Sequence, residues 1–459
     1  MAIRKLWYIT LLAVLMQQPI FTAVSEVPQA QNTYGKKSLM FAIAAGLIGI
    51  GALVKKSFFT PASAQSKPNI SMPRAFAVGQ TIPIVYRDEY NFPQSFLNTM
   101  LSYVHPFDTQ KYRTIADTVV TWLGIEKSQL YKPDIVSDVD LALVHTDNYL
   151  KSLQSSATIS EIIDMGQLLS WVPNSFFQNN LLIPMKYAVG GTIAGAQLAI
   201  KYGWAINLAG GYHHAKANKG EGGCVYADIP IAIKKLWKDF PDLKVMIIDL
   251  DAHQSNGIEL ILGKSPKVYI FDMFNKNVAP VELDLLEEKP IYTYYPEQEG
   301  LIEVEPRRPL DKLPNVYAVP LEGGKLSSEV YGIPMPDIFV ERCVDRAISV
   351  DEYMKKLQEE LPKAYADCIN YFRGQRPDLI IYNAGTDIYE DDIWGCMNID
   401  KTGIYGRDQY IFEYVMHDKK IPILMLPAGG YFQESGRVIG ASIAGLIKNV
   451  VLPELKARK

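Results

Sequence analysis

The feature that most constrains the fold is a set of short apolar segments that are continuous rather than alternating. They are Trp204–Leu208, Val245–Leu250, Val268–Phe271, Leu379–Tyr382 and Ile423–Leu426. Continuous apolar runs of this length are typical of strands that are buried on both faces of a parallel sheet. We therefore expect each segment to be a strand that is buried on both faces of one sheet.

Amphipathic segments separate several of these runs and predict helices. The clearest are Ile229–Phe240, Ser349–Gly374 and Tyr405–Asp418, and a further helix, Gly190–Tyr202, precedes the first run. Strands that alternate with helices indicate an α/β fold with a mainly parallel sheet. Gly300–Gly324 holds several prolines and mixed charge, so we expect a loop there.

Composition excludes several classes of protein. The chain has 459 residues and a formal charge of −4, which argues against direct binding of nucleic acid through an overall basic surface. Apolar residues make up 48% and charged residues 21%, as in an ordinary globular protein. Four cysteines are too few for a disulfide scaffold, and the lack of a CxxC pair argues against a thiolate zinc site and against the zinc nucleobase deaminases.

The N-terminal region differs from the rest of the chain. Leu6–Met16 is an apolar run behind Arg4 and Lys5, Leu39–Val54 is a second run between lysines, and Ala62-Ser63-Ala64 resembles a signal-peptidase site. We expect residues 1–75 to be a signal or membrane-anchor segment with a linker, and residues 76–459 to be a catalytic domain. Export with cleavage near Ala64, a retained membrane anchor and a tail that never meets a membrane remain open.

Residues capable of chemistry lie at or just after the end of every predicted strand. Ligand sites of parallel sheets lie beyond the carboxyl ends of the strands, so these residues should meet in one place. The segments are Gly210-Gly211-Tyr212-His213-His214, Asp249-Leu250-Asp251-Ala252-His253, Asp272, Asn383-Ala384-Gly385-Thr386-Asp387 and Pro427-Ala428-Gly429-Gly430-Tyr431.

Asp251, His253 and Asp387 form a candidate metal site. Asp251 and His253 are two positions apart at a strand end, where alternate residues share a face, and Asp387 comes from another strand. Two carboxylates and one imidazole leave a coordination position open, as in catalytic rather than structural zinc sites. The same ligands would also accept Fe²⁺ or Mn²⁺.

His213, His214 and Tyr431 are candidate catalytic groups. The chain has six histidines, and these two are adjacent, so we expect them to have distinct roles. A neutral histidine beside a metal can act as general base and its protonated form as general acid. Tyr431 follows two glycines and can donate a hydrogen bond to a developing oxyanion.

These residues resemble those of the zinc-dependent histone deacetylase family, and most closely its class IV branch. The segments that carry the resemblance are GWAINLAGGYHHA, MIIDLDAHQSNG, VYIFDMFN, IIYNAGTDI and PILMLPAGGY, and it extends over about residues 82–450. It implies an arginase-like three-layer α/β fold with an eight-stranded, mainly parallel sheet. It also implies hydrolysis of the amide of an N-ε-acylated lysine, with a histone or another protein as partner.

The resemblance assigns roles to individual residues. Asp251, His253 and Asp387 would ligate Zn²⁺, and His214 would be the general base and acid. It further implies that His213, held by Asp249, polarises the attacking water, that Tyr431 binds the acyl carbonyl, and that Asp249 and Asp272 form a structural K⁺ site with main-chain oxygens. The substrate channel would be lined by Gly211, Tyr212, Gly223, Trp394, Gly429 and Gly430.

Two positions depart from most of the family. Asn256 stands where an aspartate usually partners the second histidine, although the class IV branch shares this asparagine. Gly223 stands where an aromatic side chain usually lines the channel, so one wall is missing or Trp394 supplies it.

Alternative functions and locations remain open at this point. An amidohydrolase of the same fold acting on small acetylated amines such as acetylpolyamines is one, and a catalytically silent, metal-stabilised binding protein is another. Export suggested by the N-terminus contrasts with the cytosolic or nuclear location of most relatives. A bacterial protein acting outside its own cytoplasm would agree with both.

Overall fold

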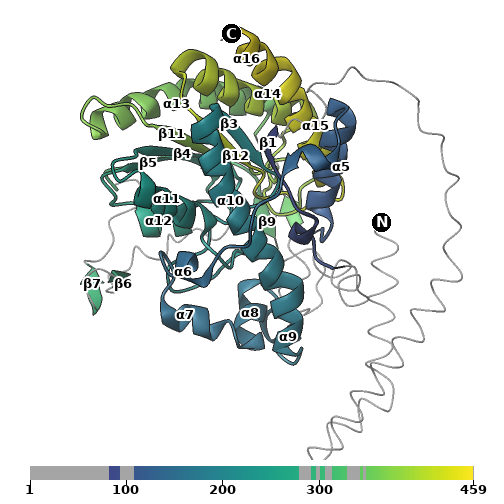
Figure 1. Ribbon diagram of the computed structural model, residues 1–459, viewed down its shortest axis with the longest axis vertical. Helices are drawn as coiled ribbons and strands as arrows, with labels where there is room; N and C mark the ends of the chain where they lie inside the picture. The colour runs from purple at the N-terminus through teal and green to yellow at the C-terminus, as the bar shows by residue number, and fades with distance from the viewer. Residues whose placement is uncertain are drawn as a thin grey trace, which may run out of the picture. The chain divides into compact units, whose positions relative to one another are not determined.

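The computed structural model describes residues 82–93, 108–278, 291–295, 300–304, 313–327, 342–344 and 348–457 (Figure 1). The signal or anchor segment and linker predicted for residues 1–75 lie outside the described residues.

The fold is built around an eight-stranded sheet in which every neighbouring pair is parallel, as predicted. The strand order is β2-β1-β3-β12-β11-β4-β5-β8. The five strands predicted from apolar runs are the five adjacent inner ones, β3 to β5 in this order. The bounds are β1 (Ile82–Val85), β2 (Leu130–Tyr131), β3 (Trp204–Asn207), β4 (Val245–Asp249), β5 (Val268–Asn275), β8 (Val316–Leu321), β11 (Leu379–Asn383) and β12 (Ile423–Leu426).

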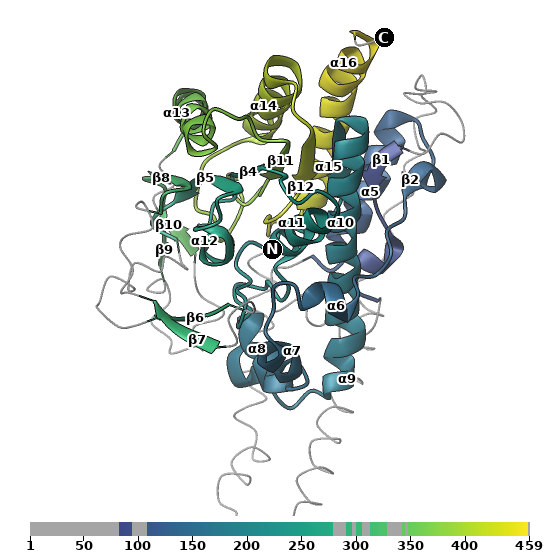
Figure 2. The same cartoon turned by 60° about the vertical axis from the view of Figure 1, so that its left-hand side comes forward.

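Helices cover both faces of the sheet and complete a three-layer fold (Figures 1 and 2). α10 (Ile183–Tyr202), α11 (Asp228–Asp239) and α12 (Asn256–Leu262) contribute to the core on one face, which includes Ile247 of β4. α13 (Val350–Tyr371), α14 (Lys401–Phe412) and α15 (Ser435–Leu446) contribute to the core that includes the next residue, Ile248. Both isoleucines are fully buried, and each such side chain contributes about 1.5–3 kcal/mol.

Smaller elements surround this core. α5 (Lys111–Leu123) packs along α15, and two antiparallel pairs, β6–β7 and β9–β10, lie outside the main sheet. Their bounds and those of the other helices are β6 (Ile291–Tyr295), β7 (Gly300–Val304), β9 (Lys325–Ser327), β10 (Arg342–Val344), α6 (Asp138–Leu141), α7 (Asp147–Ser152), α8 (Ser156–Ile162), α9 (Asn174–Phe177) and α16 (Leu452–Ala457). Single turns of 3₁₀ helix are Asp88–Tyr90, Lys127–Gln129 and Gly166–Leu169, and π-helical turns are Gln178–Leu182, Glu413–Lys419 and Ile447–Val451.

The predicted helices all exist, and two of them begin four or more residues earlier than predicted. α10 begins at Ile183 rather than Gly190, because Pro184 suits the first turn of a helix, where no intrahelical N–H bond is lost. α14 begins at Lys401 rather than Tyr405, because the side chain of Asp400 accepts a hydrogen bond from the Gly403 N–H and caps it.

The prediction of a loop over Gly300–Gly324 was wrong in part. The segment contains β7 and β8, and β8 forms the edge of the main sheet beside β5. Pro320 lies inside β8, and proline is tolerated in a strand that has a neighbour on only one side. β5 also extends to Asn275 rather than Phe271, because Asp272 lies within the strand opposite Ala318 instead of ending it.

Among the described residues, one helical stretch, Ser435–Ala457, is long and apolar enough to cross a membrane by length and composition alone. More than half of its most apolar window, 56%, is buried inside the fold. Its first part, α15, packs along α5, so the stretch serves as a core helix of this domain.

His145 allows a prediction about stability and pH. The Ala227 N–H donates to its Nε2 atom at 3.0 Å, so the neutral ring carries its proton on Nδ1. Burial lowers the pKa of His145 to about 4, below the usual 6.5. As pH falls through 6.5, the unfolded chain binds a proton that the folded chain rejects. We therefore expect the free energy of unfolding to fall between pH 6.5 and 4, by roughly 3 kcal/mol from this group.

The measurement is denaturant unfolding of the wild type and His145→Gln at several pH values. A glutamine oxygen can accept from the same N–H but does not titrate, so the difference between the two proteins should shrink as pH falls. Parallel curves from pH 7 to 4 would show that His145 does not contribute to acid sensitivity.

Candidate active site

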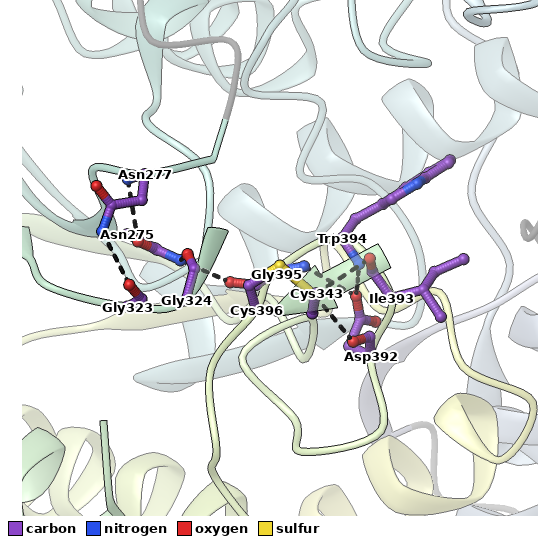
Figure 3. Close-up of a disulfide and its surroundings, with 10 residues drawn as sticks. All are labelled: Asn275, Asn277, Gly323, Gly324, Cys343, Asp392, Ile393, Trp394, Gly395 and Cys396. Atoms are coloured by element: carbon purple, nitrogen blue, oxygen red, sulfur yellow. Dashed lines mark hydrogen bonds between the residues drawn. A yellow bond between two sulfur atoms is a disulfide. The ribbon is translucent and has the colours of Figure 1, made fainter. Parts of the chain in front are cut away.

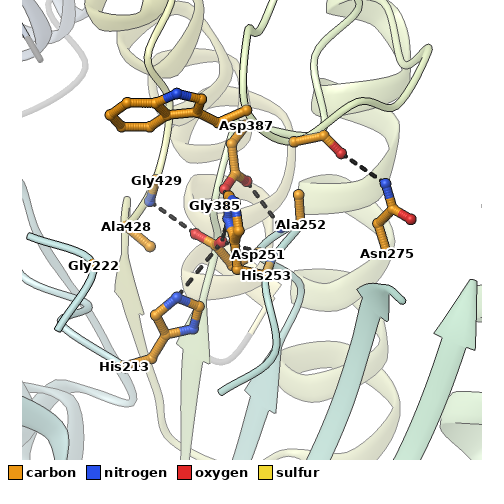
Figure 4. A network of polar contacts seen from close by, with 12 residues as sticks. His213, Gly222, Asp251, Ala252, His253, Asn275, Gly385, Asp387, Ala428 and Gly429 are labelled. Carbon is orange, nitrogen blue, oxygen red and sulfur yellow. Dashed lines mark hydrogen bonds and ion pairs between the residues drawn. The ribbon is translucent and has the colours of Figure 1, made fainter. Parts of the chain in front are cut away.

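Asp251, His253 and Asp387 come together as a buried triad at the carboxyl ends of β4 and β11, with ligand atoms all within 4.8 Å of one another. His253 Nδ1 lies 3.1 Å from Asp251 Oδ1 and 2.8 Å from Asp387 Oδ2. Figure 4 shows the three side chains pointing toward one another. One nitrogen and two carboxylate oxygens in this arrangement suit a divalent metal ion.

The backbone positions the three side chains of the triad in a different way from the one predicted. Asp251 and His253 lie in the bend after β4, not on a strand, so their convergence does not come from alternation along a strand. Backbone donors hold the carboxylates instead: the Gly429 N–H donates to Asp251 Oδ2 at 2.9 Å, and the Ala252 N–H to Asp387 Oδ1 at 2.9 Å. A Cβ at Gly429 would lie 2.5 Å from Asp251 Oδ2, so only glycine lets this backbone approach.

The electrostatics of the triad also suit a cation. Burial and the neighbouring charge of Asp251 raise the pKa of Asp387 to about 7. Burial alone would lower the pKa of His253, but hydrogen bonds to Asp251 and Asp387 more than offset it and raise this pKa to about 10. Two buried carboxylates at this distance repel each other unless positive charge lies between them. The residues therefore fit a metal ion chemically as well as geometrically.

His213 and His214 are buried side by side, with ring centroids 4.1 Å apart, but face different partners. His213 Nδ1 lies 3.2 Å from Asp249 Oδ2, and its Nε2 lies 3.6 Å from Asp251 Oδ1. Burial would lower the pKa of His213, but the charges of Asp249 and Asp251 outweigh it and raise the pKa to about 9.

His214 has the opposite character. Burial, followed by the positive charges of His213 and His253, holds the pKa of His214 well below its usual value. Its Nδ1 lies 2.8 Å from Asn256 Oδ1. The pKa values of the two adjacent histidines are thus shifted in opposite directions.

Asn256 is itself held by a carboxylate that the sequence did not reveal. Its Nδ2 donates to Glu221 Oε2 at 3.2 Å, and Lys216 Nζ lies 2.7 Å from the same oxygen. The carboxylate of Glu221 therefore does not contact His214 directly but through Asn256. Lys216 partly neutralises the charge of this carboxylate. Glu221 lies only two residues before Gly223 in a glycine-rich loop, where nothing in the pattern distinguished it from a solvent-exposed charge.

Tyr431 is half-buried beyond β12, and burial together with the charges of Asp251 and Asp387 holds its pKa well above the usual value. It therefore keeps its proton and can donate a hydrogen bond. The turn before it is fixed by Lys111, a fully buried lysine of α5 whose Nζ donates to the carbonyls of Ala428 at 2.8 Å and Gly429 at 3.1 Å. Sequence reasoning missed Lys111, because a single lysine at the start of an amphipathic helix gives no signal.

The candidate cation site also forms in part. Asp249 ends β4 and Asp272 lies opposite it in β5. Asp272 Oδ2 accepts from the N–H and the hydroxyl of Ser255, both at 2.8 Å, whereas its Oδ1 is buried without a hydrogen-bond partner in the described structure. Burial and the charges of Glu259 and Asp249 raise the pKa of Asp272 well above its usual value. An unpartnered buried oxygen in an acidic environment fits a monovalent cation.

The contacts of the residues predicted to line the channel differ from one residue to the next. Trp394 packs on Tyr431 with ring centroids 4.5 Å apart, and Gly429 contacts the metal triad. The main-chain N–H groups of Gly211 and Tyr212 both donate to Asp228 at 2.9 Å, so these two residues shape the loop. An added Cβ at Gly223 would meet nothing within 4 Å, whereas one at Gly430 would clash with Thr386. None of these observations tests the lining of a channel, which stays a prediction.

The fold and the site together place a buried candidate metal site at the carboxyl edge of a parallel sheet. Comparison with known proteins gives the family: residues 105–446 match the histone deacetylase domain, and the chain belongs to that family. "Histone deacetylase 2" of Arabidopsis thaliana is 34% identical over 365 residues, which cover 80% of this chain and 78% of the relative.

Two further comparisons give another relative and a solved structure with the same fold. An uncharacterised protein of the cyanobacterium Picosynechococcus is 26% identical over 76% of this chain and 92% of its own length. The crystal structure of the HDA15 HD domain shares the fold, with a TM-score of 0.53 over 82% of this chain and 90% of that one, at 19% identity.

Proposed function

We propose that the protein is a Zn²⁺-dependent lysine deacylase that hydrolyses the amide of N-ε-acylated lysine on a protein substrate. The observation that carries the proposal is the meeting of the Asp251–His253–Asp387 triad with a neutral histidine and a protonated tyrosine. The class IV resemblance and the similarity to Arabidopsis "Histone deacetylase 2" support a lysine amide as substrate.

The residues would divide the reaction among them. Asp251, His253 and Asp387 would hold Zn²⁺, which when bound acts as a Lewis acid and makes water a stronger acid. His214, being neutral, takes a proton from the attacking water and later gives it to the leaving lysine amine. His213 stays cationic and stabilises negative charge, and the Tyr431 hydroxyl donates to the oxyanion.

The second cation is part of the same proposal. Asp249 and Asp272 would bind K⁺ together with main-chain oxygens near Asp251, His253 and Asp272. The unpartnered Oδ1 of Asp272 supports this assignment. Because Asp249 also contacts His213 and Asn383, a cation there would fix the position of the first histidine.

The proposal is tested by assaying one preparation on acetyl-lysine peptides, fatty-acyl-lysine peptides and acetylpolyamines side by side. Tyr431→Phe is the matched variant, because it keeps the ring against Trp394 and removes only the hydroxyl that is proposed to bind the oxyanion. We expect turnover of acyl-lysine peptides that falls by about 10²–10³-fold in Tyr431→Phe. Turnover of acetylpolyamines alone would assign the protein to the small-molecule alternative, and no turnover of any substrate would support a silent binding protein.

Gly223 allows a prediction about how tightly the substrate binds. Gly223→Phe should place a ring where the backbone leaves open space and bury the methylenes of a lysine side chain, each worth about 0.8 kcal/mol. We expect KM for an acetyl-lysine peptide to fall, with kcat unchanged, and the ratio of kcat/KM between small and bulky acyl groups to rise.

Backbone strain requires a control, because Gly223 has φ +73°, which disfavours any side chain. Gly374, at the exposed end of α13, has φ +86° and equally open space around its Cβ position, so Gly374→Phe matches the strain away from the site. An unchanged acyl-group ratio in folded Gly223→Phe would mean that residue 223 does not line the channel.

A further inference from the structure

A disulfide joins the site to β10, a strand outside the main sheet. Cys343 of β10 and Cys396 are linked across 53 residues of sequence (Figure 3). β10 pairs with β9 outside the main sheet, whereas Cys396 lies in the loop after Asp387 and is fully buried. The link therefore connects a strand outside the main sheet to a segment that begins five residues after a metal-ligand candidate, the segment Asp392–Cys396.

The segment Asp392–Cys396 holds Tyr431 through two contacts. Asp392, fully buried, accepts a hydrogen bond from the Tyr431 N–H at Oδ2, at 2.6 Å. Its other oxygen, Oδ1, accepts from the N–H groups of Trp394 at 2.9 Å and Gly395 at 3.1 Å. The Trp394 ring then packs on the Tyr431 ring. One carboxylate thus fixes both the segment and the catalytic tyrosine.

The far end of the segment is tied to the rest of the fold. Asn275, the last residue of β5, donates from Nδ2 to the carbonyls of Gly395 at 3.1 Å and Gly324 at 3.0 Å. The Gly324 N–H donates to the Cys396 carbonyl at 2.8 Å (Figure 3). The covalent link to Cys343 adds to these weaker bonds at the end opposite Asp392.

We propose that Asp392 is a positioning residue for Tyr431 and that the Cys343–Cys396 disulfide makes this positioning sensitive to reduction. The inference rests on the proposed function only in the role of Tyr431. When the disulfide is reduced, the segment Asp392–Cys396 keeps its hydrogen bonds but loses its covalent link. The Tyr431 hydroxyl is then held less closely at the place where the oxyanion develops. A misplacement of about 1 Å can cost about 10²-fold in rate, so a loosened contact is sufficient for control.

The reducing partner is a dithiol. Cys343 is half-buried and Cys396 fully buried, so a thiolate of the dithiol attacks Sγ of Cys343 and Cys396 leaves as a thiolate that takes a proton. The second thiol of the dithiol then attacks the mixed disulfide and releases the Cys343 thiol. Two electrons and two protons pass to the enzyme, and the dithiol becomes a disulfide.

The first experiment establishes the link and the response in the purified enzyme. Peptide mapping without reductant should find Cys343 joined to Cys396, with Cys224 and Cys368 free. After dithiol treatment we expect kcat to fall about tenfold with KM and bound zinc unchanged. Amide hydrogen exchange in the peptide that contains Tyr431 should accelerate, because its N–H is held by Asp392.

Variants separate the disulfide from other effects of a thiol reagent. Cys343→Ser should show the rate and exchange of the reduced wild type and should not respond further to the dithiol. Cys368→Ser, which removes a buried free thiol of α13, should respond like the wild type. Asp392→Asn should accelerate exchange at Tyr431 and lower kcat with the disulfide intact.

Several results would overturn the inference. Four free thiols in the oxidised enzyme would remove the link, and unchanged exchange and kcat after verified reduction would remove its effect. Equal loss of activity in Cys343→Ser and wild type on adding the dithiol would point to removal of the metal instead. If no acyl-lysine substrate is turned over in either state, the proposed function fails, and the exchange measurement alone decides whether the disulfide and Asp392 hold Tyr431.

Discussion

His253→Ala is expected to lose bound zinc and, with it, hydrolytic activity. His253 Nδ1 is the nitrogen of the triad and lies within 3.1 Å of both carboxylates. Removal of the imidazole leaves two buried carboxylates without the donor between them. Loss of an outer partner of a ligand typically costs 10–100-fold in metal affinity, so loss of the ligand itself should exceed about 100-fold. Zinc content by elemental analysis after dialysis is the direct measurement.

Two histidine variants serve as controls for that experiment. His417→Ala removes an exposed histidine after α14 and should keep both zinc and activity. His213→Ala removes a buried histidine that lies next to the triad but is not a ligand candidate, so it should keep zinc and lose only part of the activity. A full complement of zinc in folded His253→Ala would mean that the ion binds elsewhere.

The inner strands of the sheet could be predicted because burial on both faces leaves a continuous apolar run. Val245–Asp249 and Ile423–Leu426 are fully or almost fully buried along their whole length, and the pattern records this directly. β8 could not be predicted, because an edge strand needs fewer apolar residues and tolerates Pro320. Its burial is interrupted, and such a pattern resembles a loop.

The residues of the site were predictable to the extent that they follow inner strands. Asp251, His253, Asp387, His213 and His214 all lie beyond strand ends, where parallel topology brings them together. The residues that support the site come from elsewhere: Lys111 of α5 holds the turn before Tyr431, Glu221 of a glycine-rich loop contacts Asn256, and Cys343 of β10 is bonded to Cys396. A supporting contact depends on which segments, far apart in the sequence, pack against each other. A single sequence does not show which segments do so.

His214→Ala is expected to lower the rate by about 10²–10⁴-fold while zinc is retained, because general base and acid catalysis typically contributes this much. Burial and two neighbouring histidines hold the pKa of His214 well below its usual value, so at neutral pH the ring is ready to accept a proton. The pKa of His213 is raised to about 9, which favours a role in stabilising charge over the role of base. The measurement is kcat with an acetyl-lysine peptide at pH 7, alongside zinc content.

The comparison with His213→Ala decides between the two histidines. If His214 moves the proton and His213 acts through its charge, His214→Ala should be the slower enzyme at every pH. Asn256→Ala tests the contact that orients His214. It removes the oxygen 2.8 Å from His214 Nδ1 but leaves the imidazole ring in place. It should lower kcat less than His214→Ala. A His214→Ala enzyme with near wild-type kcat at pH 7, with His213→Ala inactive, would reverse the assignment and make His213 the proton carrier.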